Sequence, residues 1–235
     1  MDQRPTLIAH CGFHKTGLAA GSPTREFPCY HGTMMILRTA GPSPYGRKVR
    51  LAAAILKLED RITIQAADAM DASDNLRQQN PLGKIPVLVT DDGTALYDSP
   101  VILEYLDHQA GGGRILPAEP KARFAALRLQ ALCDGLLDAA LLRVYEGRWR
   151  DPDRREEKWL TYQADKMTRC LDVLEMSPPV VGDTPDVGHI TLACALGYLD
   201  LRFERQWRAD YPGLVRWLDA FAQSVPAFEQ TKVNA

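Results

Sequence analysis

The 235-residue chain has few cysteines, little net charge and no long apolar run. Its five cysteines are scattered and form no C-x-x-C pair, which argues against a disulfide framework and favours a reducing, cytoplasmic location. Because 28 basic residues face 30 acidic ones, no global basic field favours nucleic acid or an anionic membrane. No stretch approaches about 18 apolar residues, and no apolar segment follows the N-terminal charges, so neither a transmembrane helix nor a secretory signal is expected.

The composition that remains is that of an ordinary globular protein. Hydrophobic residues make up 46% and charged residues 25%, which excludes a disordered or collagen-like chain. At roughly 150 residues per domain, the length predicts one large or two small domains with a core that needs no covalent staples.

Residues 1–33 differ from the rest of the chain. They are rich in glycine and proline and show no sustained periodicity, so we expect a poorly ordered N-terminal extension. Five residues of zinc-ligand type fall within it, His10, Cys11, His14, Cys29 and His31, and the last four could form a four-ligand site. Their spacing is not that of a common zinc finger, so we interpret the cluster as coincidental and predict no metal site.

Residues 34–110 alternate between strand and helix signals. Short β-branched runs predict strands over 35–39 and 61–65, and apolar residues from Val49 recur at helical spacing. Asp92-Gly93 between two apolar runs predicts a hairpin. Serine before proline, at Ser43 and again at Ser99, predicts the N-cap of a helix at each place.

The second half of the chain carries helical patterns only. The three glycines from Gly111 end the mixed block, and we predict a linker over 111–120. Residues 121–235 are expected to form an all-helical domain. The segment 190–201 is apolar nearly all round, which predicts a central, buried helix.

Three separated motifs carry a resemblance. They run from Ser43 (SPYGRKV), from Asn80 (NPLGKIPVL) and from Asp98 (DSPVILEYL), and a weaker fourth runs from Gly182 to Ile190. In order and spacing they resemble the glutathione S-transferase family, in particular its bacterial serine-type members. The resemblance implies an α/β thioredoxin-like N-terminal domain plus an all-α helical C-terminal domain. It also implies a homodimer, with glutathione as co-substrate and no metal.

Ser43 is the catalytic candidate that this resemblance implies. A hydroxyl at a helix N-terminus, together with the helix dipole, can stabilise a nearby thiolate. A thiol with a pKa of about 8.5 is only about 3% ionised at pH 7, so lowering that pKa to about 6.5 would make roughly three quarters of it thiolate. The alternative is that Ser43 only caps its helix.

The other two motifs supply candidate glutathione-binding residues: Lys84, Ile85, Pro86, Asp98 and Ser99. Ile85-Pro86 resembles the cis-proline turn of the family, where the backbone of the residue before proline pairs with glutathione like an added strand; a plain trans turn is equally open. Asp98 stands where the family usually has Glu or Gln and is one methylene shorter than Glu. Ser99 is either a ligand for the γ-glutamyl carboxylate or an N-cap.

Two further groups of polar residues have structural interpretations. Asp186 and His189 precede the apolar helix at capping-box spacing, so we expect them to start that helix. Arg47, Lys48 and Arg50 lie in the first turns of the first predicted helix, where we favour a solvated face over a field that attracts anions.

The resemblance implies a detoxification-type enzyme that conjugates the glutathione thiolate to a small hydrophobic electrophile held by the helical domain. A glutathione-dependent isomerase or dehalogenase and a non-catalytic binding or assembly module remain alternatives. A thiol redox reaction is disfavoured, because a mixed disulfide with glutathione needs a cysteine at position 43 and this chain has serine there. Cys133, Cys170 and Cys194 fall in apolar helical patterns and are expected to be inert.

Overall fold

The structure, a computed structural model, describes residues 34–233. The predicted extension over 1–33, with its cysteines and histidines, lies outside the described residues. Within 34–233, no helix is long and apolar enough to cross a bilayer.

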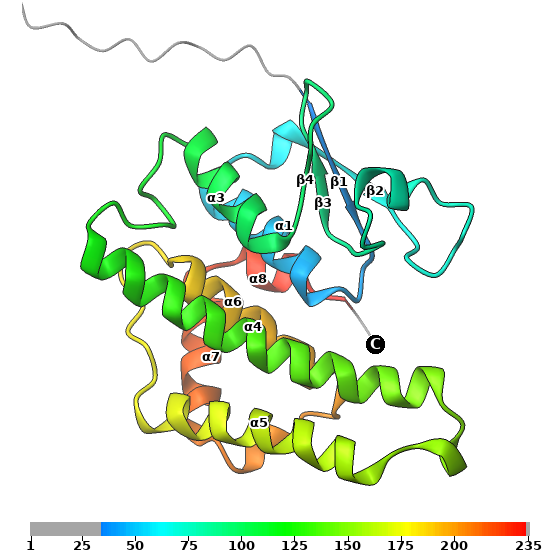
Figure 1. Cartoon of the computed structure of the whole chain (residues 1–235). Helices are drawn as coiled ribbons and strands as arrows, with labels where there is room; N and C mark the ends of the chain where they lie inside the picture. Colours follow the sequence, from blue (N-terminus) through cyan, green and yellow to red (C-terminus); the bar gives the residue numbers. More distant parts are fainter. Residues whose placement is uncertain (1–33, 234–235) are drawn as a thin grey trace, which may run out of the picture. The chain divides into compact units, whose positions relative to one another are not determined.

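A four-stranded mixed sheet forms the first part of the described chain (Figure 1). Its strands stand in the order β2-β1-β3-β4, where β1 is Met35–Thr39, β2 Ile62–Ala66, β3 Val87–Val89 and β4 Ala95–Leu96. Strand β1 pairs parallel to β2 and antiparallel to β3, and β3 pairs antiparallel to β4. The predicted hairpin is confirmed, and Gly93 supplies the positive φ of 87° that its turn requires.

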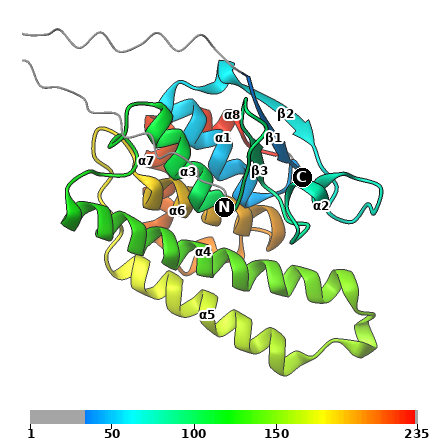
Figure 2. The ribbon, with the colours of Figure 1, turned by 45° about the horizontal axis from the view of Figure 1, so that its top comes forward.

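Helices α1 (Pro44–Leu56) and α3 (Ser99–Gln109) cover one face of the sheet, and the short α2 (Leu76–Gln79) lies on the other (Figures 1 and 2). The helical repeat that begins at Val49 is buried at all four positions, Val49, Ala52, Ala53 and Leu56. This stripe faces the core, so apolar burial stabilises α1.

The remaining helices form the second part. They are α4 (Pro120–Trp149), α5 (Glu157–Met176), α6 (Val187–Arg202), α7 (Pro212–Ser224) and α8 (Ala227–Gln230), and 3₁₀ turns occur at Glu59–Arg61, Pro152–Arg154 and Gln206–Ala209. The short α8 has no counterpart among the predicted elements, because its four residues are too few to show a period.

Helix α6 is the centre of the helical part, as predicted. Twelve of its 16 residues are buried, and it contacts α1, α4 and α7. Its start is a capping box. The Asp186 carboxylate accepts hydrogen bonds from the backbone N–H groups of Gly188 and His189. In return, the His189 Nδ1 accepts a hydrogen bond from the Asp186 N–H. Both residues therefore have the structural role expected of them. Together, the mixed sheet and the helical part confirm the predicted fold class.

Candidate functional site

Ser43 is the N-cap of α1. Its backbone is extended (φ −73°, ψ 116°), and its Oγ accepts a hydrogen bond of 3.1 Å from the Gly46 N–H. The Ser43 N–H donates to the carbonyl of Ala40 at 3.0 Å, which closes the turn after β1. In the capping bond the Ser43 hydroxyl acts only as an acceptor. Its own O–H donates to no other residue within 34–233. Capping and donation to a ligand are therefore compatible in the same side chain.

The glycine at position 46 keeps this turn close to the end of β1. A Cβ on Gly46 would overlap the Oγ1 of Thr39, the last residue of β1. A side chain at position 46 would force Thr39 to shift, so glycine there keeps the Gly46 N–H within reach of the Ser43 Oγ.

The Ile85-Pro86 peptide bond is cis, which decides between the two geometries that the spacing left open. Asn80 is buried and organises the turn that precedes the bond: its amide donates to the Lys84 carbonyl at 2.9 Å, and its Oδ1 accepts from the Leu82 N–H at 3.0 Å. Within 34–233, the backbone N–H and carbonyl of Ile85 form no hydrogen bond. Lys84 is exposed, and its ammonium has no partner among the described residues.

Asp98 and Ser99 begin α3, but not in the predicted arrangement. Ser99 is the first helical residue rather than the N-cap; Asp98 takes the cap position with an extended backbone, and its carboxylate makes no capping bond. The N-cap interpretation of Ser99 is therefore wrong. Ser99 is 1% exposed, and its hydroxyl has no hydrogen-bond partner in the described part of the chain, whereas Asp98 is exposed. Both side chains are thus available to a ligand.

The strand register brings these segments to one edge of the sheet. Arg38 on β1 pairs with Val87 on β3, so the turn that leads to Ser43 starts beside the Ile85-Pro86 bond. Leu88 pairs with Leu96 on β4, so the same edge continues to Asp98 at the start of α3. Two helix N-termini and one unpaired stretch of backbone meet there, which is a setting suited to an anionic peptide.

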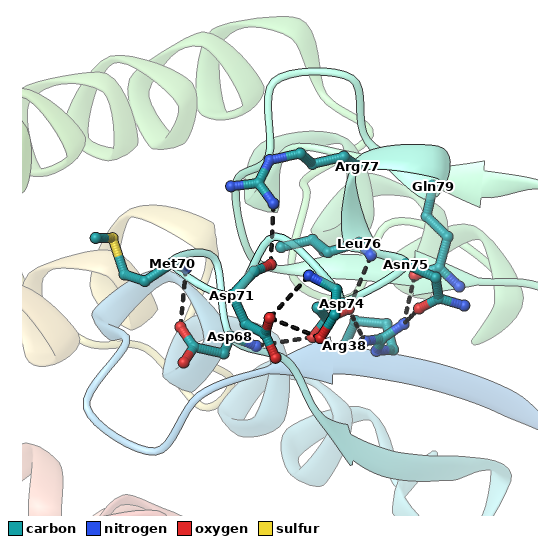
Figure 3. Close-up of polar contacts among 10 residues, drawn as sticks. Arg38, Asp68, Met70, Asp71, Asp74, Asn75, Leu76, Arg77 and Gln79 are labelled. Carbon is teal, nitrogen blue, oxygen red and sulfur yellow. Dashed lines mark hydrogen bonds and ion pairs between the residues drawn. The ribbon is translucent and has the colours of Figure 1, made fainter.

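A buried arginine that no motif marked, Arg38, supports the segment that precedes Lys84 (Figure 3). Arg38 is 3% exposed; its Nη1 donates to Asn75 at 2.6 Å and to Gln79 at 2.8 Å, and its Nη2 donates to Asp74 at 2.6 Å. The Asp74 carboxylate also accepts from the N–H groups of Asp68 and Leu76, and the Asp68 bond is the largest cause that keeps its pKa below the ordinary value. Arg38 thereby ties the segment 68–79, which leads to Lys84 and Ile85, to β1.

Polar contacts also join α1 to α4. Lys48 is fully buried and donates to Asp134 at 2.6 Å, and Tyr45 donates to Asp138. Burial raises the pKa of Asp134 in spite of the nearby ammonium, and burial together with the Asp138 carboxylate raises that of Tyr45. The prediction of a solvated face is wrong for Lys48 and also for Arg47, which is 9% exposed.

Comparisons with known proteins agree with this architecture. The family model described as the glutathione S-transferase N-terminal domain matches residues 42–109, and the C-terminal domain model matches residues 135–220. The GST-like protein YibF of Escherichia coli K12 is 36% identical over 196 residues, which cover 78% of this chain and 95% of YibF. This chain belongs to the glutathione S-transferase family. A solved glutathione S-transferase of Methylobacillus flagellatus, with glutathione bound, has a TM-score of 0.79 at 35% identity and covers 85% of this chain and 100% of its own.

A more distant relative has a named activity. A probable maleylacetoacetate isomerase of Drosophila melanogaster is 27% identical over 96% of this chain and 92% of its own length. That relative is thus similar to nearly the whole of this chain.

One of the three described cysteines, Cys194, lines the same cavity as Ser43. Cys133, Cys170 and Cys194 are buried and free. Burial raises all three pKa values, to about 12 for Cys170 and to about 11 for Cys194, so these thiols stay protonated at neutral pH. Among residues 34–233, no group of three or more His, Cys, Asp and Glu side chains has the arrangement of a metal site.

Proposed function

We propose that this protein is a glutathione transferase in which Ser43 donates a hydrogen bond to the glutathione thiolate. The sulfur then forms a bond to an electrophilic carbon of the acceptor, and the leaving group departs with the electron pair of the broken bond. The single observation that carries the proposal is the unshared hydroxyl proton of Ser43 at the start of α1, where the dipole also favours an anion. A solved relative with glutathione bound supports the choice of thiol.

The remaining assignments follow the same edge of the sheet. Ile85 offers its backbone to the cysteinyl part of glutathione beside the cis Pro86, and Ser99 with the first N–H groups of α3 holds the γ-glutamyl carboxylate. Asp98 receives the γ-glutamyl ammonium, and Lys84 is placed for the glycyl carboxylate.

At the level of the whole chain, the thioredoxin-like part (34–110) binds glutathione. The linker (111–120) leads to the helical part (121–235), which holds the acceptor. We further propose that the enzyme is a cytoplasmic homodimer.

A glutathione-dependent isomerase is the second candidate, because a relative similar over nearly the whole chain is a probable maleylacetoacetate isomerase. In that reaction the thiolate adds to the acceptor and is expelled again, so glutathione is regenerated. Product analysis separates the two: conjugation consumes glutathione and yields a thioether, whereas isomerisation consumes none. A non-catalytic module would bind glutathione without either product.

The test is the Ser43→Ala variant, with kcat/KM measured at pH 7. We expect a fall of roughly ten- to a hundredfold, or about 1.4 to 2.7 kcal/mol. Ser177→Ala is the matched control, since Ser177 is exposed at the end of α5 and forms no hydrogen bond within the described residues. An unchanged rate in Ser43→Ala would remove Ser43 from the reaction.

A further inference from the structure

A cavity of about 310 Å³ opens directly beside Ser43. Its walls come from the turn before α1, from α6 and from the end of the described chain. Three cationic side chains line it: Arg47, Arg205 and Lys232. The cavity therefore combines the reactive hydroxyl with a concentration of positive charge, although the chain as a whole carries a net charge of −2.

Arg47 is the most informative of the three, because its charge is buried without a carboxylate partner. Its Nη2 donates to the Phe228 carbonyl at 2.5 Å, its Nε donates to Thr231 at 3.3 Å, and the guanidinium lies 4.1 Å from the centre of the Phe228 ring. All of these partners are neutral, and no ion pair forms between Arg47 and another residue of 34–233. Burial accordingly lowers the pKa of Arg47. A buried charge without a counter-ion is costly, and an anion in the cavity would offset that cost.

The free edge of this guanidinium faces the cavity. Among the described residues, Arg47 Nη1 forms no hydrogen bond, and it passes over Gly197 of α6, where a Cβ would lie 2.5 Å from it. Gly197 thus leaves room for the Arg47 Nη1 group at the cavity wall. A carboxylate in the cavity could accept a hydrogen bond from that group.

The acidic side of the cavity is already neutralised. Asp200 is the acidic residue in its lining, and that carboxylate accepts from Arg208 at 2.6 and 2.9 Å and from the Trp207 indole at 2.9 Å. Lys232 forms an ion pair with the exposed Glu229 at 3.1 Å, whereas Arg205 is exposed and forms no ion pair within 34–233. The surplus charge around the cavity is therefore positive.

We infer that this cavity receives the anionic group of the acceptor, and that the acceptor is a small organic acid rather than a purely hydrophobic electrophile. The inference rests on the proposed function, since it names the substrate class of that same site. Arg47 stands one helical turn after Ser43, so a carboxylate at Arg47 places a carbon a few bonds away beside the thiolate. The volume lies at the small end of ligand pockets, which suits an acid of that size.

Calorimetry with two isosteric probes tests the charge preference. 4-Nitrobenzoate and 4-nitrobenzamide are each titrated into the full-length protein, once alone and once saturated with S-methylglutathione, which has no thiol to react. We expect the carboxylate to bind at least about tenfold more tightly than the amide. Equal affinity for the two probes overturns the inference but leaves glutathione binding intact. Failure to bind S-methylglutathione refutes the proposed function instead, and the inference falls with it.

Two variants and one control locate the preference. Arg205→Gln/Lys232→Gln removes two exposed charges of the lining and no contact of the core, and Arg47→Met removes the buried charge, with circular dichroism as the check on folding. Loss of most of the preference in either variant supports the inference, and full retention in both overturns it. Arg216→Gln on α7 is the control, because Arg216 is exposed and outside the cavity.

Discussion

Replacement of Lys48 by methionine tests how firmly α1, which carries Ser43, is held to the helical part. The variant removes the ammonium but keeps an apolar stem of similar shape, so Asp134 is left without its partner. Breaking a buried ion pair from one side costs about 3 to 5 kcal/mol. Lys48 is fully buried, but the Asp134 side chain is 19% exposed, so we expect the lower end, about 3 kcal/mol. With an m-value of about 2 kcal/mol/M, the urea midpoint should fall by about 1.5 M.

The pH dependence of this deficit has a definite sign. Burial already raises the pKa of Asp134 above its unfolded value, so the folded state gains stability when that carboxyl is protonated and loses it as pH rises through the folded pKa. Without Lys48 that pKa rises further, because the attraction of the ammonium is gone. The deficit of Lys48→Met should therefore be full at pH 7 and smaller at pH 5.

Urea unfolding of the wild type and the variant at both pH values is the assay. Lys48→Met/Asp134→Leu should recover most of the loss, because neither charge is then left unpaired. Lys232→Met, which breaks the exposed pair with Glu229, is the control and should change nothing measurable. A deficit below about 1 kcal/mol at pH 7, or one that is equal at both pH values, would show that the Lys48–Asp134 pair does not hold α1 in this way.

Two further predictions concern the support of the site and its thiols. Arg38→Met should raise the KM for glutathione roughly tenfold with little change in kcat, because the segment before Lys84 loses its anchor. Steady-state kinetics check this, and a fall in kcat alone would contradict it. Arg216→Met on α7, which is exposed and outside this segment, is the control. In a Cys11→Ser/Cys29→Ser background, the three buried thiols should react with a disulfide reagent only as fast as the protein unfolds. Rapid labelling of the native protein would show that these thiols are accessible in the folded state.

Local signals in the sequence predicted the elements that carry the site. Serine before proline located the start of α1 and the cap at Ser43, and Asp92-Gly93 located the hairpin that leads to Asp98. These features succeed because they depend on backbone preferences within a few residues. The preference of serine before proline for the N-cap position gave the wrong residue at Ser99. Asp98, one residue earlier, has the extended backbone of the N-cap, and the preference of a serine hydroxyl for that position does not reveal backbone angles.

Partners far apart in the chain could not be predicted. Lys48 and Asp134 are 86 residues apart, and Arg38 is 36 residues from Asp74. Charged residues near the start of a helix are usually solvated, so nothing in the pattern marked Arg47 or Lys48 as buried. The burial of a charge depends on what packs over it, here α4 and α8, and that is a property of the tertiary structure.

Calorimetric titration of glutathione at pH 7, in two buffers of different ionisation enthalpy, measures whether the bound thiol is ionised. We expect saturable binding with release of about 0.7 proton, since a bound thiol whose pKa falls from about 8.5 to about 6.5 becomes mostly ionised. S-Methylglutathione should bind without proton release, and Ser43→Ala should bind glutathione with less. Binding of glutathione to the wild type without proton release, or no binding at millimolar concentration, would contradict the proposed activation of the thiol by Ser43.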